Sequence, residues 1–198
     1  MGSEMCIRDR RSMESIAGSE QISHMIAHIA HQIIEKRGVE DVTLLGIPSG
    51  GVPLAQRLGE AIAAETGVSV PLGSLDVTPY RDDLRRRPHR ALQETVYPHG
   101  GVEDKVVVLV DDVFSTGRTI RAALDALADV GRPRRVELAV LVDREQPEFP
   151  IRPDYVGTAV AHLPEDANVV CELQPLDSAD RITSVSYTHL TLPTILLV

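Results

Sequence analysis

The sequence has few cysteines, no long apolar run and no excess of positive charge, and each shortage excludes a class of protein. Its two cysteines, Cys6 and Cys171, offer neither a disulfide framework nor the spacing of a zinc site, so a reducing, cytoplasmic location is expected. No stretch reaches the roughly 20 apolar residues of a membrane-spanning helix, and the N-terminus lacks the apolar core of a signal peptide. A net charge of −9 argues against indiscriminate binding to nucleic acid or to an anionic membrane.

The length of 198 residues suits one α/β domain with a sizeable core. Both ends look foreign to that domain, because residues 1–12 lack periodicity and residues 184–198 follow what looks like the last native strand. The two tails resemble translated adaptor or vector sequence, and we expect them to carry no function. The alternative for these residues is a genuine amphipathic tail that docks on the core. We therefore predict a single domain over residues 13–183.

Between the tails, helical and strand patterns alternate. Ile22, Ile26, Ile29 and Ile33 recur at helical spacing, which predicts a helix over residues 19–37 that ends at Gly38. Further helices are expected at 52–66 and from 119 onward. Strands are expected at 42–47, 68–75, 106–110 and 135–142, with edge segments at 154–156 and 169–173. Repeated β-α units of this kind imply right-handed crossovers and a parallel sheet.

The run from Val106 to Thr119 is the most informative part of the chain. Five consecutive apolar residues, four of them β-branched, predict a strand buried on both faces, with Asp111 and Asp112 following at the edge of the sheet. The next loop offers hydroxyls and backbone N–H groups and leads into a helix, whose N-terminus favours an anion. The residues of this loop are Ser115, Thr116, Gly117, Arg118 and Thr119.

Two carboxylates beside a phosphate-binding loop need a reason, since like charges repel. A sugar between them supplies one, because neighbouring ribose hydroxyls can donate hydrogen bonds to Asp111 and Asp112 while a phosphate on the same sugar rests in the loop. The competing interpretation is an ordinary β-α turn in which the acids cap a helix. A cap needs only one acid, so the sugar-phosphate interpretation is favoured.

This unit of apolar strand, paired acids, small-residue turn and helix resembles the phosphoribosyl pyrophosphate (PRPP) signature of the type I phosphoribosyltransferases. The resemblance implies an α/β fold in which helices flank a parallel sheet, with a small hood and a mobile lid loop. Two further segments, 75–84 with Tyr-Arg-Asp-Asp-Leu at its end and 129–144, resemble the bifunctional pyrimidine operon attenuation regulators and uracil phosphoribosyltransferases. That similarity covers about residues 19–173.

For this family, the resemblance implies a reaction of uracil with PRPP that gives UMP and pyrophosphate, with Mg²⁺ on the pyrophosphate. It also implies a regulator that senses UMP or PRPP, binds pyrimidine-operon mRNA for transcription attenuation, and forms a homodimer or higher homo-oligomer. The alternative is a phosphoribosyltransferase for another, purine-type nucleobase without an RNA role. The Tyr-Arg-Asp-Asp-Leu segment argues against that alternative.

The reaction needs positioning and electrostatics more than a nucleophile, because breaking the bond to pyrophosphate develops opposite charges on the ribose and the leaving group. The catalytic candidates are Asp111, Asp112 and Arg81. Arg81 lies on the segment 80–101, which looks like a mobile lid that excludes water. A second glycine-rich loop lets backbone N–H groups approach an anion and is expected to face the pyrophosphate. It contains Ser49, Gly50 and Gly51.

Base recognition is harder to place. The segment 153–157 resembles the part of related enzymes where an aromatic ring covers the nucleobase, which makes Tyr155 and Val156 candidates. A core edge strand with an inward-packed tyrosine is an equally good interpretation. Asp143 ends its strand on the active side and is a candidate for metal or pyrophosphate binding, with a structural ion pair as the alternative.

The sequence departs from the family pattern at charged positions. Ser49-Gly50-Gly51 stands where the usual pattern has Thr-Arg-Gly, which removes a cation beside the pyrophosphate. Residues 145–147 replace a Gly-His-Arg run and Thr158 replaces a lysine on the normally basic RNA-binding face. Each lost cation removes one phosphate contact. The remaining candidate RNA contacts are His28, His31, Arg132, Arg134 and Arg144.

Overall fold

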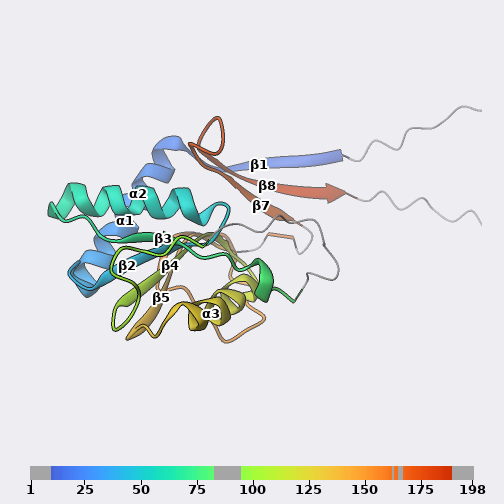
Figure 1. Ribbon diagram of the computed structural model, residues 1–198. Coiled ribbons are helices and arrows are strands. Elements are labelled where there is room, and N and C mark those ends of the chain that lie inside the picture. Colours follow the sequence, from blue (N-terminus) through green and yellow to red (C-terminus); the bar gives the residue numbers. More distant parts are fainter. Residues whose placement is uncertain (1–9, 83–94, 162, 165–166, 189–198) are drawn as a thin grey trace, which may run out of the picture.

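The computed structural model describes residues 10–82, 95–161, 163–164 and 167–188, arranged as a helix-flanked sheet with a second, smaller sheet beside it (Figure 1). The segment 80–101, predicted as a lid, lies mostly outside the described residues. Of the helices in the described part, none combines the length and the apolar character needed to cross a membrane.

The main sheet is parallel and has the strand order β3-β2-β4-β5-β6. Its strands are β2 (Val42–Gly46), β3 (Leu72–Ser74), β4 (Val106–Phe114), β5 (Arg135–Asp143) and β6 (Tyr155–Ala159). The helices are α1 (Ser19–Arg37), α2 (Gly51–Thr66) and α3 (Arg118–Val130), with a 3-10 turn η1 (Thr78–Tyr80). The predicted fold class, a parallel sheet flanked by helices, is confirmed.

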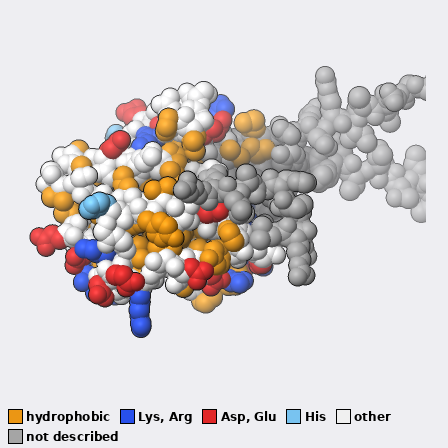
Figure 2. Space-filling model, in the orientation of Figure 1, with side chains coloured by type: hydrophobic (Ala, Val, Ile, Leu, Met, Phe, Trp, Pro, Cys, Tyr) orange, Lys and Arg blue, Asp and Glu red, His pale blue; other side chains and the backbone are white. Residues whose placement is uncertain are grey.

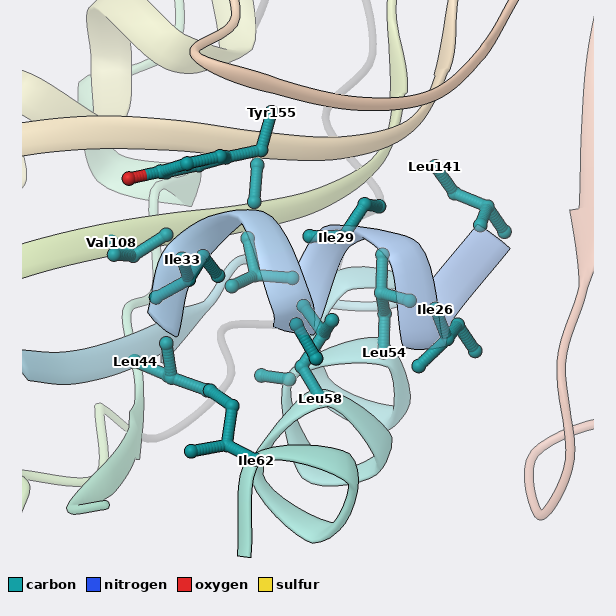
Figure 3. Close-up of a cluster of buried hydrophobic side chains, with 14 of the residues drawn as sticks. Ile26, Ile29, Ile33, Leu44, Leu54, Leu58, Ile62, Val108, Leu141 and Tyr155 are labelled. Carbon is teal, nitrogen blue, oxygen red and sulfur yellow. The ribbon is translucent and has the colours of Figure 1, made fainter. Parts of the chain in front are cut away.

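The two faces of the sheet are buried under different helices, which explains the continuous apolar runs of the central strands. Val108 of β4 packs in the cluster under α1 and α2, whereas its neighbour Leu109 packs in the cluster under α3. Figure 3 shows the first cluster, where side chains of α1, α2 and the sheet interdigitate. Its labelled members are Ile26, Ile29, Ile33, Leu44, Leu54, Leu58, Ile62, Val108, Leu141 and Tyr155.

The smaller sheet is the expected hood. It is antiparallel, with the order β1-β8-β7, and consists of β1 (Arg10–Gly18), β7 (Asn168–Glu172) and β8 (Arg181–Thr188). The segment expected as a strand at 169–173 belongs here rather than to the edge of the main sheet. Pairs such as Arg10 with Thr188 and Glu14 with Ser184 continue the β1–β8 ladder into residues that the sequence pattern assigned to foreign tails.

Most expected element positions agree with the structure, and one difference matters for the site. Helix α1 spans the predicted residues 19–37, and Gly38 ends it at φ 68° with its N–H donating to the Ile34 carbonyl at 2.8 Å. Strand β4 is longer than the predicted 106–110, because Asp111 and Val113 still pair with β5. The paired acids therefore lie inside the strand rather than after it.

Candidate functional site

A pocket of about 430 Å³ opens at the carboxyl ends of the central strands, where ligands of parallel sheets usually bind. The main-sheet layer contributes the loop after β2, the end of β4, the start of α3 and Arg81, and the hood contributes β7 and the loop that follows it. The lining residues are Pro48, Ser49, Gly50, Arg81, Asp111, Asp112, Val113, Thr119, Cys171, Leu176 and Asp177.

The two aspartates of β4 both face this pocket but differ in exposure. Asp112 is half-buried, whereas Asp111 is only 7% exposed. The reason is that Asp111 is a paired residue of β4, opposite Val140. Backbone groups of the same strand hold both carboxylates. The N–H of Asp112 donates to Asp111 Oδ1 at 3.1 Å, and the N–H of Val113 donates to Asp112 Oδ1 at 2.9 Å.

The hood closes the pocket with residues that the sequence patterns did not single out. Cys171 of β7 lies close enough to the acids that burial first, and then the charges of Asp112 and Asp111, raise the pKa of its thiol above the ordinary value. Asp177 accepts a hydrogen bond from the N–H of Leu173 at 2.8 Å and so stays at the pocket wall. No local pattern could have found these residues, because their position depends on how the hood folds over β4.

The start of α3 is suited to an anion. Gly117 precedes the helix at φ 87° and has no side chain to cap it, the Arg118 N–H donates only a long hydrogen bond of 3.4 Å to Thr116 Oγ1, and the first turn carries no acidic residue. The positive end of the helix dipole is therefore not neutralised by the helix itself. Of the loop residues predicted to bind phosphate, Thr119 lines the pocket, Ser115 and Thr116 are half-buried next to it, and Gly117 is buried.

The side chain of Arg118 is held by carboxylates of two flanking segments. Its Nη1 lies 2.6 Å from Asp82 Oδ2 and its Nη2 lies 2.5 Å from Glu148 Oε2. The guanidinium carbon also lies 5.6 Å from the centre of the Phe149 ring. These contacts make Arg118 a bridge between segments, while its backbone N–H donates to Thr116 Oγ1 at 3.4 Å within the loop.

The Tyr-Arg-Asp part of the marker segment is anchored along α3. The Tyr80 hydroxyl donates a hydrogen bond to Asp129, which is the largest cause of its raised pKa. Arg81 Nη1 donates to Thr119 Oγ1 at 3.4 Å, and Asp82 lies between Arg118 and Arg121. Anchors on both sides of Arg81 thus keep its guanidinium at the pocket, where it stays a candidate for catalysis.

The glycine loop joins the pocket from the other side. A Cβ on Gly51 would lie 2.1 Å from the Val110 carbonyl oxygen, so only glycine lets this loop pack against β4. The N–H of Ile47 donates to the same oxygen at 2.8 Å, and the N–H of Gly51 donates back to Ile47 at 3.0 Å. Ser49 and Gly50, at the tip of the loop, line the pocket beside the β4 acids.

Tyr155 does not belong to the pocket, and its assignment as a base-binding residue is corrected. It is 2% exposed and begins β6, at the opposite end of the parallel strands. Its hydroxyl donates to Glu137 Oε2 at 2.6 Å, and Lys36 Nζ lies 4.8 Å from the centre of its ring. The alternative interpretation, a core tyrosine that packs inward, is the one the structure supports. Val156 is half-buried against the cluster under α3 and is not among the pocket residues.

Asp143 lies at the carboxyl end of β5, but it does not line the pocket. Its Oδ1 accepts a hydrogen bond from the N–H of Glu145 at 2.8 Å, which turns it toward its own loop. Arg144 follows it and is 8% exposed, with its N–H donating to the Phe114 carbonyl at 2.9 Å. A side chain buried to this degree cannot contact RNA at the surface, so that assignment of Arg144 is corrected.

The other candidate RNA contacts lie on two elements of the fold. His28 and His31 are exposed on α1, where a hydrogen bond and the charge of Glu65, 2.8 Å from His31 Nδ1, raise the pKa of His31. Arg132 and Arg134 are exposed before β5, and Arg134 pairs with Asp41 at 3.2 Å. On the face shown in Figure 2, acidic and basic side chains are interspersed.

The charges around the pocket restrict what can enter it. Three carboxylates, of Asp111, Asp112 and Asp177, face a single guanidinium, that of Arg81, among the described residues of the lining. A multiply charged anion therefore needs an accompanying cation. Within the described ranges, no cluster of three or more His, Cys, Asp or Glu side chains could hold a metal ion alone. The arrangement suits a ligand that brings hydroxyls to the carboxylates and a metal on its own oxygens.

Comparison with known proteins gives a consistent result. The family model of the phosphoribosyl transferase domain matches residues 12–175. The bifunctional protein PyrR of Corynebacterium glutamicum is 54% identical over 177 residues, which cover 85% of this chain and 90% of that protein. PyrR of Streptomyces coelicolor is 52% identical over 82% of this chain and 83% of its own length. Among solved structures, a hypoxanthine-guanine phosphoribosyltransferase from Bacillus anthracis has a TM-score of 0.63 at 18% identity, covering 90% of this chain and 99% of that one, which shows a shared fold.

Proposed function

The chain belongs to the phosphoribosyltransferase family, and from that membership we propose that it is a PyrR-type bifunctional protein: a uracil phosphoribosyltransferase that also regulates pyrimidine-operon expression by mRNA binding and attenuation. One observation carries the enzymatic half of the proposal. The aspartates of β4 share a pocket with the uncapped start of α3, the glycine loop and Arg81. That combination matches a sugar with an anion at each end.

In the proposed complex, each part of PRPP meets a different element. The ribose hydroxyls donate to Asp111 and Asp112, and the 5′-phosphate accepts from the backbone N–H groups and hydroxyls of residues 115–119. The pyrophosphate lies at the loop of Ser49, Gly50 and Gly51, within reach of Arg81. The bond from the anomeric carbon to pyrophosphate breaks as the bond to a uracil nitrogen forms, and that nitrogen loses its proton.

Magnesium fits the chemistry of this site because the pocket offers carboxylate oxygens, the donors that Mg²⁺ prefers. The pyrophosphate oxygens would supply most of its ligands, and Asp111 and Asp112 are the carboxylates of β4 that would help to hold it. The ion supplies charge neutralisation for the pyrophosphate as it leaves. This role agrees with a lining in which carboxylates outnumber the guanidinium.

With Tyr155 in the core, the uracil is assigned to the hood side of the pocket. Cys171 and Leu176 form that wall, and the raised pKa keeps the Cys171 thiol neutral beside the acids. A small, uncharged side chain there suits a flat, neutral base. Asp177 lies at the same wall, where its carboxylate accepts a hydrogen bond from the base in this proposal.

The regulatory half of the proposal is supported by relatives named bifunctional protein PyrR, at 50–57% identity. His28, Arg132 and Arg134 are the exposed candidates that remain for RNA contact, and His31 is a weaker one because Glu65 and Glu35 neighbour it. A homodimer or higher homo-oligomer is proposed as the RNA-binding form. With few free cations, the protein is expected to bind RNA selectively and with a modest salt dependence.

A panel of nucleobases assayed with PRPP, with and without Mg²⁺, tests the enzymatic proposal. UMP and pyrophosphate should form with uracil only, and only when Mg²⁺ is present. Turnover of hypoxanthine or guanine instead of uracil would replace the proposal with the purine-type alternative.

The regulatory proposal is tested by titrating pyrimidine-operon leader RNA, and a scrambled RNA of equal length, over a series of salt concentrations. UMP should increase the affinity for the leader RNA alone. Equal affinity for both RNAs, or no effect of UMP, would leave an enzyme without this regulatory role.

A further inference from the structure

The loop between β7 and β8 carries part of the hood wall of the pocket. Its residues Leu176 and Asp177 line the pocket, and Leu176 also lines a neighbouring groove of about 360 Å³ between this loop and the first turns of α2. Leu176 is 63% exposed. Because a groove separates the loop from α2 here and Leu176 stays largely in solvent, apolar packing contributes little to the position of this wall.

An ion pair between Arg57 of α2 and Asp180 holds the loop instead. Arg57 Nη1 lies 2.8 Å from Asp180 Oδ2, and the two side chains are 23% and 7% exposed. The other oxygen of this carboxylate, Asp180 Oδ1, accepts a hydrogen bond from the N–H of Gln174 at 2.9 Å. One carboxylate therefore joins the end of the loop to its beginning and to α2. With so little exposure it is stable only beside its cation, so loss of Arg57 should drive Asp180 toward water.

Hydrogen bonds inside the loop transmit the position of Asp180 to the pocket wall. The N–H of Leu173 donates to Asp177 Oδ2 at 2.8 Å, and the N–H of Asp177 donates to the Leu173 carbonyl at 3.0 Å. The Gln174 side chain also donates to the Ser178 carbonyl at 3.1 Å. The loop is thus tied to itself, and it should shift as a unit if the ion pair with α2 is lost.

Helix α2 begins at the glycine loop, so the ion pair connects two walls of the pocket. Arg57 lies about two turns after Gly51, the first residue of the helix. Ser49, at the tip of the glycine loop, lines both the pocket and the groove, as Leu176 does. The spacing between the glycine loop and the hood wall therefore depends on how α2 holds the loop of the hood.

We infer that Arg57 is a positioning residue for the nucleobase. By holding Asp180, it keeps Leu176 and Asp177 at the pocket and at a fixed distance from the glycine loop. The role in the reaction rests on the function proposed above, which assigns uracil to this wall. The anchoring of the loop by Arg57 does not depend on that function.

Hydrogen exchange of the ligand-free protein tests the anchoring independently of function. In Arg57→Gln the amides of Leu173 and Gln174 should exchange about tenfold faster or more, because the carboxylates that accept them move with the loop. Arg57→Lys keeps the charge and should exchange more slowly than Arg57→Gln. Glu60→Gln, on the exposed side of α2, is the control and should match wild type. Exchange that is unchanged in Arg57→Gln would overturn the inference.

A double-mutant cycle shows whether Arg57 acts through Asp180. Arg57→Gln alone should lower the melting temperature by about 5–15 °C, because it leaves a buried carboxylate without its cation. In Asp180→Asn the charge is absent, so Arg57→Gln should cost less than half as much in that background. Equal costs in both backgrounds would refute the coupling. If Arg57→Gln alone does not fold, the neutral double variant serves for the kinetic measurement.

Uracil kinetics then test the positioning role. Arg57→Gln should raise the KM for uracil about tenfold or more, as expected for one lost polar contact with the base, and change the KM for PRPP by less than about threefold. Arg57→Lys should recover most of the loss. A KM for uracil equal to wild type in the folded variant would refute the role. Wild-type protein that does not convert uracil would instead refute the proposed function, and hydrogen exchange would still decide whether Arg57 anchors the loop.

Discussion

The Tyr155 hydroxyl donates a hydrogen bond to Glu137 Oε2 at 2.6 Å, in the interior and at the opposite end of the strands from the pocket. Arg37, at the end of α1, donates to the other oxygen of the same carboxylate, with its Nε at 2.7 Å. Arg37, Glu137 and Tyr155 form what we call the Glu137 cluster, which joins α1 to β5 and β6. A buried carboxylate needs this kind of complete pairing.

Replacing Tyr155 by phenylalanine tests whether this residue serves the fold or the base. The variant should lose about 1–3 kcal/mol of unfolding free energy, because the buried carboxylate of Glu137 loses a hydrogen bond. The KM for uracil should stay within about twofold of wild type. Tyr97→Phe, at a tyrosine that is 66% exposed, is the matched control and should change neither quantity. A large rise in the KM for uracil with unchanged stability would restore Tyr155 to the site.

The stability of the protein should also fall in acid because of Glu137. Burial alone raises the pKa of this carboxyl, but the hydrogen bonds from Arg37 and Tyr155 and the charge of Arg37 outweigh it, so the pKa lies below the ordinary value of 4.5. A depressed pKa means that the contribution of Glu137 is complete above pH 4.5 and is lost as the pH falls through the folded-state value.

Urea unfolding of wild type and Glu137→Gln at a series of pH values measures this effect. The difference in unfolding free energy between the two proteins should be constant near neutral pH and shrink below pH 4.5. A difference that grows on acidification would mean that the folded-state pKa of Glu137 is raised instead.

Asp111→Asn and Asp112→Asn should each weaken PRPP binding without unfolding the protein. Asparagine keeps the oxygen that accepts the N–H of residue 112 or 113, so the strand stays intact. Each loses a charged acceptor for a ribose hydroxyl, which predicts about 10- to 100-fold weaker binding by calorimetry. Asp125→Asn, on the exposed side of α3, is the control. Affinity equal to wild type in both variants would refute the ribose assignment.

Arg81 and Arg118 should differ in their effect on the reaction, although both lie beside the anion loop. Arg81→Ala removes the cation of the pocket lining and should raise the KM for PRPP about tenfold or more, with partial rescue by lysine. Arg118→Ala breaks surface contacts with Asp82 and Glu148. This variant should change the KM for PRPP by less than about threefold. Steady-state kinetics distinguish them, and a larger effect at Arg118 would show that its guanidinium turns to the phosphate.

The sequence predicted those parts of the fold and site that depend on local order. The isoleucine spacing placed α1, the apolar run placed β4 in the centre of the sheet, and the small residues around Gly117 placed a strand-to-helix loop at the start of α3. Each of these features is decided by neighbours in the chain, through helical spacing, burial on two faces or a positive φ. Such signals can be read without knowledge of distant contacts.

The features that the sequence did not predict depend on distant parts of the chain. Cys171 and Asp177 reach the pocket only because the hood folds over β4, a placement stabilised by the Arg57–Asp180 ion pair at 2.8 Å. Tyr155 was ambiguous because its partner Glu137 lies in another strand. The burial of Asp111 follows from pairing with Val140, which no pattern within β4 can reveal.

The position of the acid pair inside β4 has a consequence for the kinetics of ligand capture. Side chains mounted on a paired central strand keep their spacing before any ligand arrives, so little conformational entropy is lost there on association. Slow rearrangement is then confined to elements outside the strand. PRPP should therefore associate rapidly with the rigid pair Asp111 and Asp112. Its residence time should depend on the elements outside β4 that cover the pocket.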